Sequence, residues 1–239
     1  MSTAERSCRP RFSPLGTWNE VEPTQVQAAL RRAFTAWGRP QQLRVDNGHP
    51  WGSKGDLPTD LALWLLGLGV GLLWNPPRRP QRNGVVERFQ GVGKNWSEPQ
   101  TCSDAGELQR RLDELDRLQR EAYPYQGQRS RWEVFAGLAH SGRPYSRSWE
   151  EGHWSWEQMA GGVAQQPVPR RVDQSGRVSL YNRNVYVSKL HQGQTVYVHL
   201  DVVTREWVFL DERGGVVRRQ AAEELRQEKV LRMAVTNRR

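Results

Sequence analysis

The sequence has little of what several protein classes require. Its two cysteines, Cys8 and Cys102, exclude a disulfide-stapled scaffold and a four-cysteine zinc site. No apolar run reaches the ~18 residues that a membrane-spanning helix needs, and the N-terminal stretch MSTAERSCRPRF contains no apolar signal core. We therefore expect a soluble, cytoplasmic protein with no membrane partner.

Several catalytic patterns are also missing. The five histidines show neither metal-ligand spacing nor a serine–histidine–aspartate arrangement. Gly67, Gly69 and Gly71 alternate within an apolar run, which is typical of a helix end and a tight strand approach rather than of a nucleotide-binding loop. These absences argue against a zinc enzyme, a serine hydrolase and a nucleotide-binding enzyme.

Positive charge is what the sequence has in excess. Among 239 residues, 35 are Lys or Arg and 26 are Asp or Glu, which gives a formal net charge of +9. Such an excess favours a polyanionic partner, most commonly nucleic acid. Only 36% of residues are hydrophobic and the mean hydropathy is -0.80, so we expect a modest core.

The N-terminal half reads as alternating helices and strands. Apolar residues at helical spacing predict a helix over 23–37, ended by Gly38 and Pro40. The pattern then predicts a strand at LRV with a turn at Asn47-Gly48, a helix at 57–66, an apolar segment at 70–74, a proline-rich loop, a helix starting at Gly84 and a leucine-faced helix at 105–123.

The composition changes after this half. Residues 123–170 are interpreted as a linker or arm with a short helix near 132–138. Alternating β-branched and aromatic residues over 171–220 predict a small β-barrel. A final helix at 221–233 and a basic tail are expected within 221–239.

Two acids stand where folding does not demand them. Asp46 follows a strand and Glu87 lies near the start of a helix. Carboxylates brought together in this way suit Mg²⁺, which prefers oxygen ligands and supports in-line phosphoryl displacement. The structural alternative stays open, because Asp before Asn-Gly suits a turn and Glu suits the first turn of a helix.

The surrounding pattern resembles the catalytic core of the retroviral-integrase and insertion-sequence transposase superfamily. In that family a strand ends in Asp-Asn-Gly, and a proline-containing loop with Asn-Gly precedes the catalytic Glu on a helix. The matching positions are Asp46, Asn47, Gly48, Pro76, Pro77, Pro80, Asn83, Gly84 and Glu87. The motifs cover about residues 20–100, and the strand-rich segment 171–215 is similar to the C-terminal barrel of such transposases.

The sequence departs from this family in two ways. Asp46 and Glu87 are separated by 40 residues, slightly more than the family commonly has. The extra residues fall in the loop HPWGSKGDLPTD, where Asp56 and Asp60 are runner-up acids. The family also uses a third acid on an opening strand, and no Asp precedes Asp46 in this sequence.

The missing first acid shapes the expected activity. We expect this chain alone to be inactive or nearly so, as a truncated transposase, a misassigned start or the second half of a split reading frame. Asp46 and Glu87 are the expected catalytic and metal-binding residues, and Mg²⁺ or Mn²⁺ is the expected ion.

Cations cluster around Glu87. Arg78, Arg79, Arg82, Arg88 and Lys94 lie within one short stretch, and we expect them, with Asn83, to contact DNA. An ordinary solvated surface remains the alternative. Arg88 and Lys94 are six residues apart on a helix, so they need not share a face.

Tryptophans are interpreted by their context. We expect Trp37, Trp64 and Trp207 in the core, because they follow apolar helix faces or alternate within a strand. Trp149, Trp154 and Trp156 lie in polar context, where docking of the linker is favoured over stacking on bases.

The expected fold is thus an α/β chain with a partial RNase H-like (integrase catalytic core) domain at 1–122 and a small all-β barrel. The expected function is that of a DNA transposase or integrase fragment, acting on double-stranded DNA as a homo-oligomer. Two alternatives remain open: a non-catalytic transposase-derived DNA-binding protein or inhibitor that acts through mixed oligomers, and an unrelated two-carboxylate nuclease.

Overall fold

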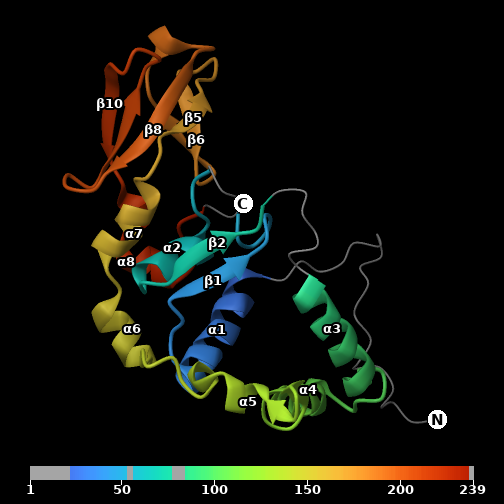
Figure 1. The fold of residues 1–239 in the computed structure, drawn as a ribbon. Helices are drawn as coiled ribbons and strands as arrows, with labels where there is room; N and C mark the ends of the chain where they lie inside the picture. Colours follow the sequence, from blue (N-terminus) through green and yellow to red (C-terminus); the bar gives the residue numbers. More distant parts are fainter. Residues whose placement is uncertain (1–21, 53–55, 77–83, 237–239) are drawn as a thin grey trace. The chain divides into compact units, whose positions relative to one another are not determined.

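The computed structural model describes residues 22–52, 56–76 and 84–236. The chain is mixed α/β, as expected from the sequence, and it divides into two compact units that are described separately (Figure 1). Within the described ranges, no helix is long and apolar enough to cross a membrane. Of the described residues, unit 1 comprises 36–38, 76 and 84–144, and unit 2 comprises 22–35, 39–52, 56–75 and 145–236.

The first part of unit 2 contains a helix followed by two parallel strands that a second helix connects. Its first elements are α1 (Pro23–Trp37), β1 (Gln42–Val45), α2 (Asp60–Gly67) and β2 (Gly71–Trp74). β1 and β2 run parallel in a register that sets Gln42 opposite Gly71 and Val45 opposite Trp74. The predicted helix at 23–37 is confirmed, and the predicted apolar segment after α2 is strand β2.

Helix α2 forms the centre of the unit 2 core. Thr59 caps its start by accepting a hydrogen bond from the N–H of Ala62 at 3.4 Å. Leu61 to Leu65 are all 0% exposed, so this helix is buried on every side. The indole of Trp154 packs against Gly67, where an added Cβ would lie 2.0 Å from the indole nitrogen. Glycine is therefore required at this position.

The stretch predicted as a linker carries two helices that the sequence analysis missed. They are α6 (Arg147–His153) and α7 (Trp156–Val163). Helix α7 packs on α2, and its Met159 and Ala160 are fully buried. Both helices begin at a serine whose hydroxyl accepts a backbone N–H, Ser146 for α6 and Ser155 for α7.

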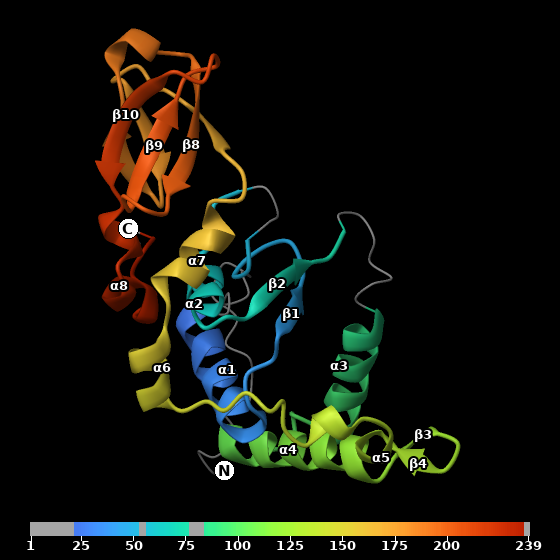
Figure 2. The same ribbon diagram turned by 60° about the vertical axis from the view of Figure 1, so that its left-hand side comes forward.

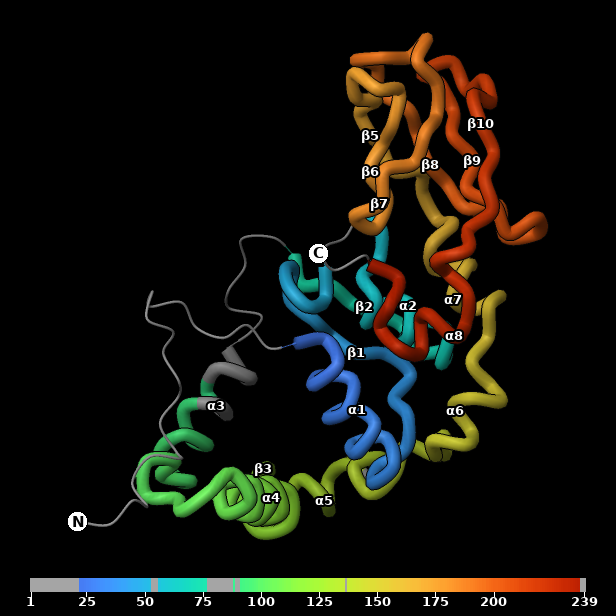
Figure 3. The backbone as a smooth tube through the Cα atoms, turned by 180° about the vertical axis from the view of Figure 1, so that it is seen from behind, coloured from blue at the N-terminus to red at the C-terminus, as the bar shows by residue number. Residues whose placement is uncertain are grey.

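The C-terminal part of unit 2 is all-β, but the predicted barrel is wrong. Four strands form an open antiparallel sheet in the order β10-β9-β8-β5, and β6 and β7 pair only with each other (Figure 3). A barrel needs hydrogen bonding that continues around the whole sheet. Pro169 in β5 has no N–H, which suits an edge strand. The strands are β5 (Val168–Arg171), β6 (Arg177–Leu180), β7 (Arg183–Tyr186), β8 (Thr195–Asp201), β9 (Glu206–Leu210) and β10 (Val216–Ala221).

The end of the described chain differs from the predicted helix at 221–233. Ala221 is the last residue of β10, and only a short 3-10 turn (Glu223–Leu225) and α8 (Gln227–Leu231) follow. Trp207 is fully buried, as predicted, and its indole N–H donates to Glu224 at 2.5 Å. This bond ties the sheet to the segment before α8.

Unit 1 is helical with one small hairpin. Helix α3 (Gly84–Ser97) packs on α4 (Ala105–Glu121), with Gly93 facing Leu115. Figure 2 shows that β3, β4 and α5 follow the end of α4. Trp37, predicted to be core, is 40% exposed and lies under the guanidinium of Arg120 at 5.1 Å. The remaining elements are β3 (Pro124–Gln126), β4 (Arg129–Ser130), α5 (Arg131–Val134) and a 3-10 turn at Ala136–Leu138.

The start of α4 is held by a reciprocal set of hydrogen bonds. Asp104 caps the helix by accepting from the N–H of Glu107 at 2.8 Å. The backbone N–H and hydroxyl of Ser103, together with Arg111, lower the pKa of Glu107 to about 2. The predicted leucine face is buried only in part, since Leu115 is 1% exposed but Leu112 is 37% exposed.

Candidate functional site

Asp46 stands at the carboxyl end of β1. Val45 before it is buried, whereas Asp46 is exposed. Among the described residues, none donates a hydrogen bond to the Asp46 carboxylate or forms an ion pair with it. The turn is closed by backbone groups instead, with Gly48 N donating to Gly52 O at 2.9 Å and Gly52 N to Gly48 O at 2.7 Å. Within the described ranges, the turn is thus closed without the side chain of Asp46.

Asn47 ties the ends of the two parallel strands together. Its Nδ2 donates to the carbonyl oxygen of Asn75 at 2.6 Å, and the N–H of Asn75 donates to Val45 O at 2.9 Å. Asn75 is the residue at which the chain leaves β2. The segment that leads toward Glu87 thus starts beside the Asp46 turn, held there by the middle residue of the Asp-Asn-Gly motif.

We expect Asn47→Ala to loosen this connection. Loss of one such hydrogen bond should lower the free energy of unfolding by about 1 kcal/mol, measured by urea denaturation of the full chain. Asn184→Ala is the matched control, because the Asn184 side chain is exposed and makes no hydrogen bond within the described ranges. Equal effects of the two substitutions would show that the Asn47–Asn75 contact contributes nothing.

The two runner-up acids are both committed to structural contacts. Asp60 is 4% exposed and accepts the N–H of Thr236 at 3.0 Å. Asp56 pairs with Arg170 at 2.5 Å. Burial raises the pKa of Asp56, but the hydrogen bond from Arg170, the N–H of Leu57 and the charge of Arg170 outweigh it and hold this pKa below its ordinary value. Asp46 is thus the better metal-ligand candidate of the three.

The structure describes only some of the predicted site residues around Glu87. The backbone of Glu87 belongs to the first turns of α3, in unit 1, whereas Asp46 belongs to unit 2. Arg88 and Lys94 are exposed on the same helix, on different faces, as their spacing predicts. Four predicted DNA contacts lie outside the described residues: Arg78, Arg79, Arg82 and Asn83.

Asp46 offers the chemistry that a magnesium site needs, as one ligand of a set. Its carboxylate is a hard oxygen donor that is exposed and has no partner in the part of the chain that the structure describes, which fits Mg²⁺ or Mn²⁺. In the described ranges, no three His, Cys, Asp or Glu side chains gather in a way that could hold a metal ion. Further ligands would therefore have to join Asp46 from other parts of the site.

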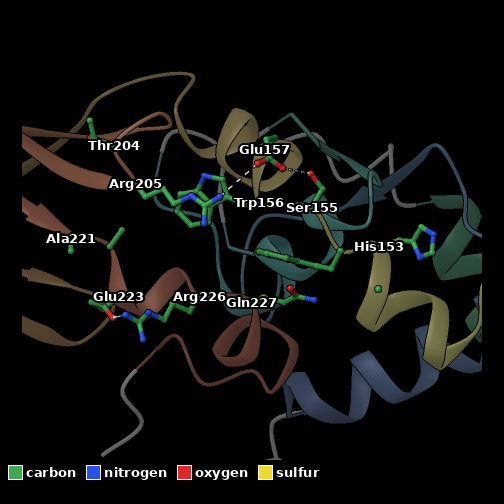
Figure 4. Close-up of a pocket in the computed structure, with 13 residues that line it drawn as sticks. His153, Ser155, Trp156, Glu157, Thr204, Arg205, Ala221, Glu223, Arg226 and Gln227 are labelled. Atoms are coloured by element: carbon green, nitrogen blue, oxygen red, sulfur yellow. Dashed lines mark hydrogen bonds and ion pairs between the residues drawn. The ribbon is translucent and has the colours of Figure 1, made fainter.

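A separate cavity of about 680 Å³ lies in unit 2, between the α6–α7 link, the β8–β9 turn and the residues before α8 (Figure 4). Its charged side chains pair with one another: Glu157 lies 3.8 Å from Arg205, and Arg226 pairs with Glu223. With these charges compensated, the cavity presents no catalytic grouping.

Two tryptophans beside this cavity serve the packing of α7. The indole N–H of Trp156 donates to Val202 O at 3.4 Å, and Trp154 is 6% exposed. The docking role expected for Trp154 and Trp156 is confirmed. The sequence signal that could have revealed helices α6 and α7 is the serine before each of them, because Ser146 and Ser155 are typical N-cap residues.

A scan of the chain against models of known protein families finds no match. The functional interpretation therefore depends on the residues themselves. They provide an exposed carboxylate at a strand end, an asparagine that links the two strand ends, and two exposed cations on the helix that carries Glu87.

Proposed function

We propose that this chain provides the Asp46 and Glu87 carboxylates of a three-acid DNA transposase or integrase, a class of enzyme that performs metal-dependent phosphoryl transfer on DNA. The observation that carries the proposal is the exposed carboxylate of Asp46 at the carboxyl end of β1, which has no hydrogen-bond or ion-pair partner among the described residues. A turn aspartate would accept local backbone N–H groups. Here the backbone groups of Gly48 and Gly52 close the turn instead.

The order of elements around Asp46 supports the same proposal. A helix, a strand ending in Asp-Asn-Gly, a second helix, a parallel strand and the helix of Glu87 follow one another along the chain. The family resemblance implies this order, in which acids at a strand end and on a following helix share metal ions. Because of this order of elements, we also propose that the chain contains a partial RNase H-like core.

In the proposed mechanism, Asp46 and Glu87 would hold a divalent metal, Asp46 from a strand end and Glu87 from a helix. A metal held there would provide charge stabilisation for an in-line displacement at phosphorus. Arg88 and Lys94 hold the phosphodiester backbone, assisted by Arg78, Arg79, Arg82 and Asn83. Asn47 positions Asp46 through its bond to Asn75 and takes no part in the chemistry.

Metal binding provides a direct test. We expect weak Mn²⁺ binding by the full chain, because two carboxylates provide only part of the coordination that such an ion prefers. Asp46→Asn should abolish it, whereas Asp56→Asn should leave it unchanged, since Asp56 is occupied by Arg170. Electron paramagnetic resonance of free Mn²⁺ measures both variants. Binding that survives in Asp46→Asn would remove Asp46 from the proposed site.

Catalysis by the chain alone provides a second test. With two of three acids, the purified protein should show no Mn²⁺-dependent strand transfer on linear DNA. Clear activity would mean that the chain supplies its third carboxylate from a position other than the one the family resemblance implies.

The alternative is a non-catalytic transposase-derived DNA-binding protein or inhibitor that acts through mixed oligomers. Co-expression with an intact transposase of the same type separates the two roles. If the chain is an inhibitor, its co-expression lowers transposition whether or not it carries the Asp46→Asn substitution. A catalytic half raises transposition by a defective partner, and only when Asp46 is present.

A further inference from the structure

The outer face of the β6–β7 hairpin carries an exposed tyrosine surrounded by cations. Tyr186 is 45% exposed, and the guanidinium of Arg218 lies 5.6 Å from its ring centre. Arg177 is its partner across the hairpin. The Tyr186 hydroxyl accepts the backbone N–H of Lys189 at 3.4 Å, and the side chain of Lys189 is exposed.

Strand periodicity explains why this face is polar. Val178 and Val185 are 2% and 8% exposed and point into the core. Their neighbours in sequence must then point to the opposite side. The next pair along that side is Ser179 opposite Asn184, both exposed. We call Arg177, Ser179, Asn184, Tyr186, Lys189 and Arg218 the Tyr186 face.

The cations of this face are uncompensated. Among the described residues, none forms an ion pair with Arg177, Lys189 or Arg218. By contrast, Arg219, the next residue on β10, pairs with Asp201 at 3.0 Å and with Glu206 at 3.4 Å.

One acid lies close to this face. Asp173 accepts the backbone N–H groups of Ser175 at 2.7 Å and Arg177 at 2.9 Å, so its carboxylate is engaged in a turn. Even if the charge of Asp173 is counted against the three cations, the face remains positive.

We propose that the Tyr186 face binds the phosphate backbone of DNA, as a contact separate from Asp46; the choice of DNA over other polyanions rests on the proposed function. Uncompensated cations displace the counterions that surround DNA. Tyrosine, serine and asparagine side chains are common phosphate partners that read no sequence. The face thus holds DNA in register without selecting a base sequence.

The test measures binding of a short labelled duplex to the full chain by fluorescence anisotropy over a range of salt concentrations. In the double variant Arg177→Gln/Arg218→Gln, the slope of log K against log salt should fall by about 2, and affinity should fall alike for unrelated sequences. The control Arg219→Gln removes one cation from β10, the strand of Arg218, but this cation is paired with Asp201 and Glu206. It should change neither quantity beyond the effect of one unit of net charge. Thermal unfolding of each variant confirms that the sheet is intact.

The outcomes separate this inference from the proposed function. A wild-type slope in the folded double variant overturns the Tyr186 face as a DNA contact. Stronger binding to phosphatidylserine vesicles than to DNA, lost in the double variant, would assign the face to a membrane surface and also overturn the proposal. The anisotropy measurement does not depend on metal binding by Asp46, so failure of the proposed metal site leaves this measurement decisive.

Discussion

Replacement of Glu150 with alanine is expected to lower the free energy of unfolding by about 3–5 kcal/mol, because it leaves a partly buried arginine without its charge partner. Glu150 is 0% exposed, and Arg31 reaches it through two bonds, of 2.6 Å and 3.1 Å. Arg147 adds a bond of 2.8 Å, and the hydroxyl of Tyr145 donates to the same carboxylate. This network joins α1 to α6.

The contacts of Arg31 extend the network to α8. Arg31 also donates to the backbone oxygen of Leu231 at 3.3 Å, and Gln27 donates to the same oxygen at 3.1 Å. Burial, and then the hydrogen bond and negative charge of Glu150, raise the pKa of Tyr145 above its ordinary value. Tyr145 therefore stays protonated and continues to donate.

Urea denaturation of the full chain measures the effect of Glu150→Ala. The control is Arg147→Ala, which removes an ion pair whose arginine is 52% exposed and should cost about 1 kcal/mol or less. If Glu150→Ala costs no more than Arg147→Ala, then the buried carboxylate does not hold α1 and α6 together.

Replacement of Trp64 with alanine should have a comparable effect, of about 3–5 kcal/mol, because it opens a cavity in a closely packed core. Trp64 is 0% exposed at the centre of α2. Its ring stacks on Phe34 at 5.9 Å between centroids, and the Arg31 guanidinium lies 5.5 Å from it. Because Phe34 and Arg31 belong to α1, this substitution also removes contacts between α2 and α1.

Two variants isolate the cause of that loss. Trp37→Ala removes an equally large side chain that is 40% exposed, and should cost much less than Trp64→Ala. Trp64→Phe keeps a stacked ring, and the indole N–H that it deletes has no partner among the described residues. We expect Trp64→Phe to retain most of the stability, as measured by thermal unfolding. Equal losses in the alanine and phenylalanine variants would contradict a cavity effect.

Local patterns in the sequence predict most elements of the fold. The helix at 23–37 is found with the predicted bounds, and the strand before Asp46 and the helix from Gly84 are found where expected. Helical spacing, strand alternation and turn residues are properties of neighbouring residues, so they can be read without knowledge of distant contacts.

The errors occur where distant contacts prevail. The sequence shows serine caps before α6 and α7, but their polar surroundings favour a linker. The burial of α7 depends on its packing against α2, which lies far away in the sequence. The predicted barrel failed because alternation identifies strands without specifying which edges pair. The helix predicted at 221–233 is found only as α8, because Ala221 pairs with β9 and Glu223–Leu225 form a 3-10 turn.

The candidate site, like the fold, was predicted from the sequence only in part. The sequence alone identified Asp46 as a metal-ligand candidate and placed it at a strand end, because the Asp-Asn-Gly motif follows a short apolar run. It left Asp46, Asp56 and Asp60 as competing acids. The structure separates them, since Arg170 occupies Asp56 and the N–H of Thr236 occupies Asp60.

The order of the elements, the excess of positive charge and the chemistry available at Asp46 are thus contained in the sequence, because each depends on residue type and near neighbours. The burial of Glu150 beneath Arg31, the exposure of Trp37 and the gathering of cations around Tyr186 required the folded chain. Each of these joins residues that are far apart in the sequence, and no local periodicity encodes which distant segments will meet.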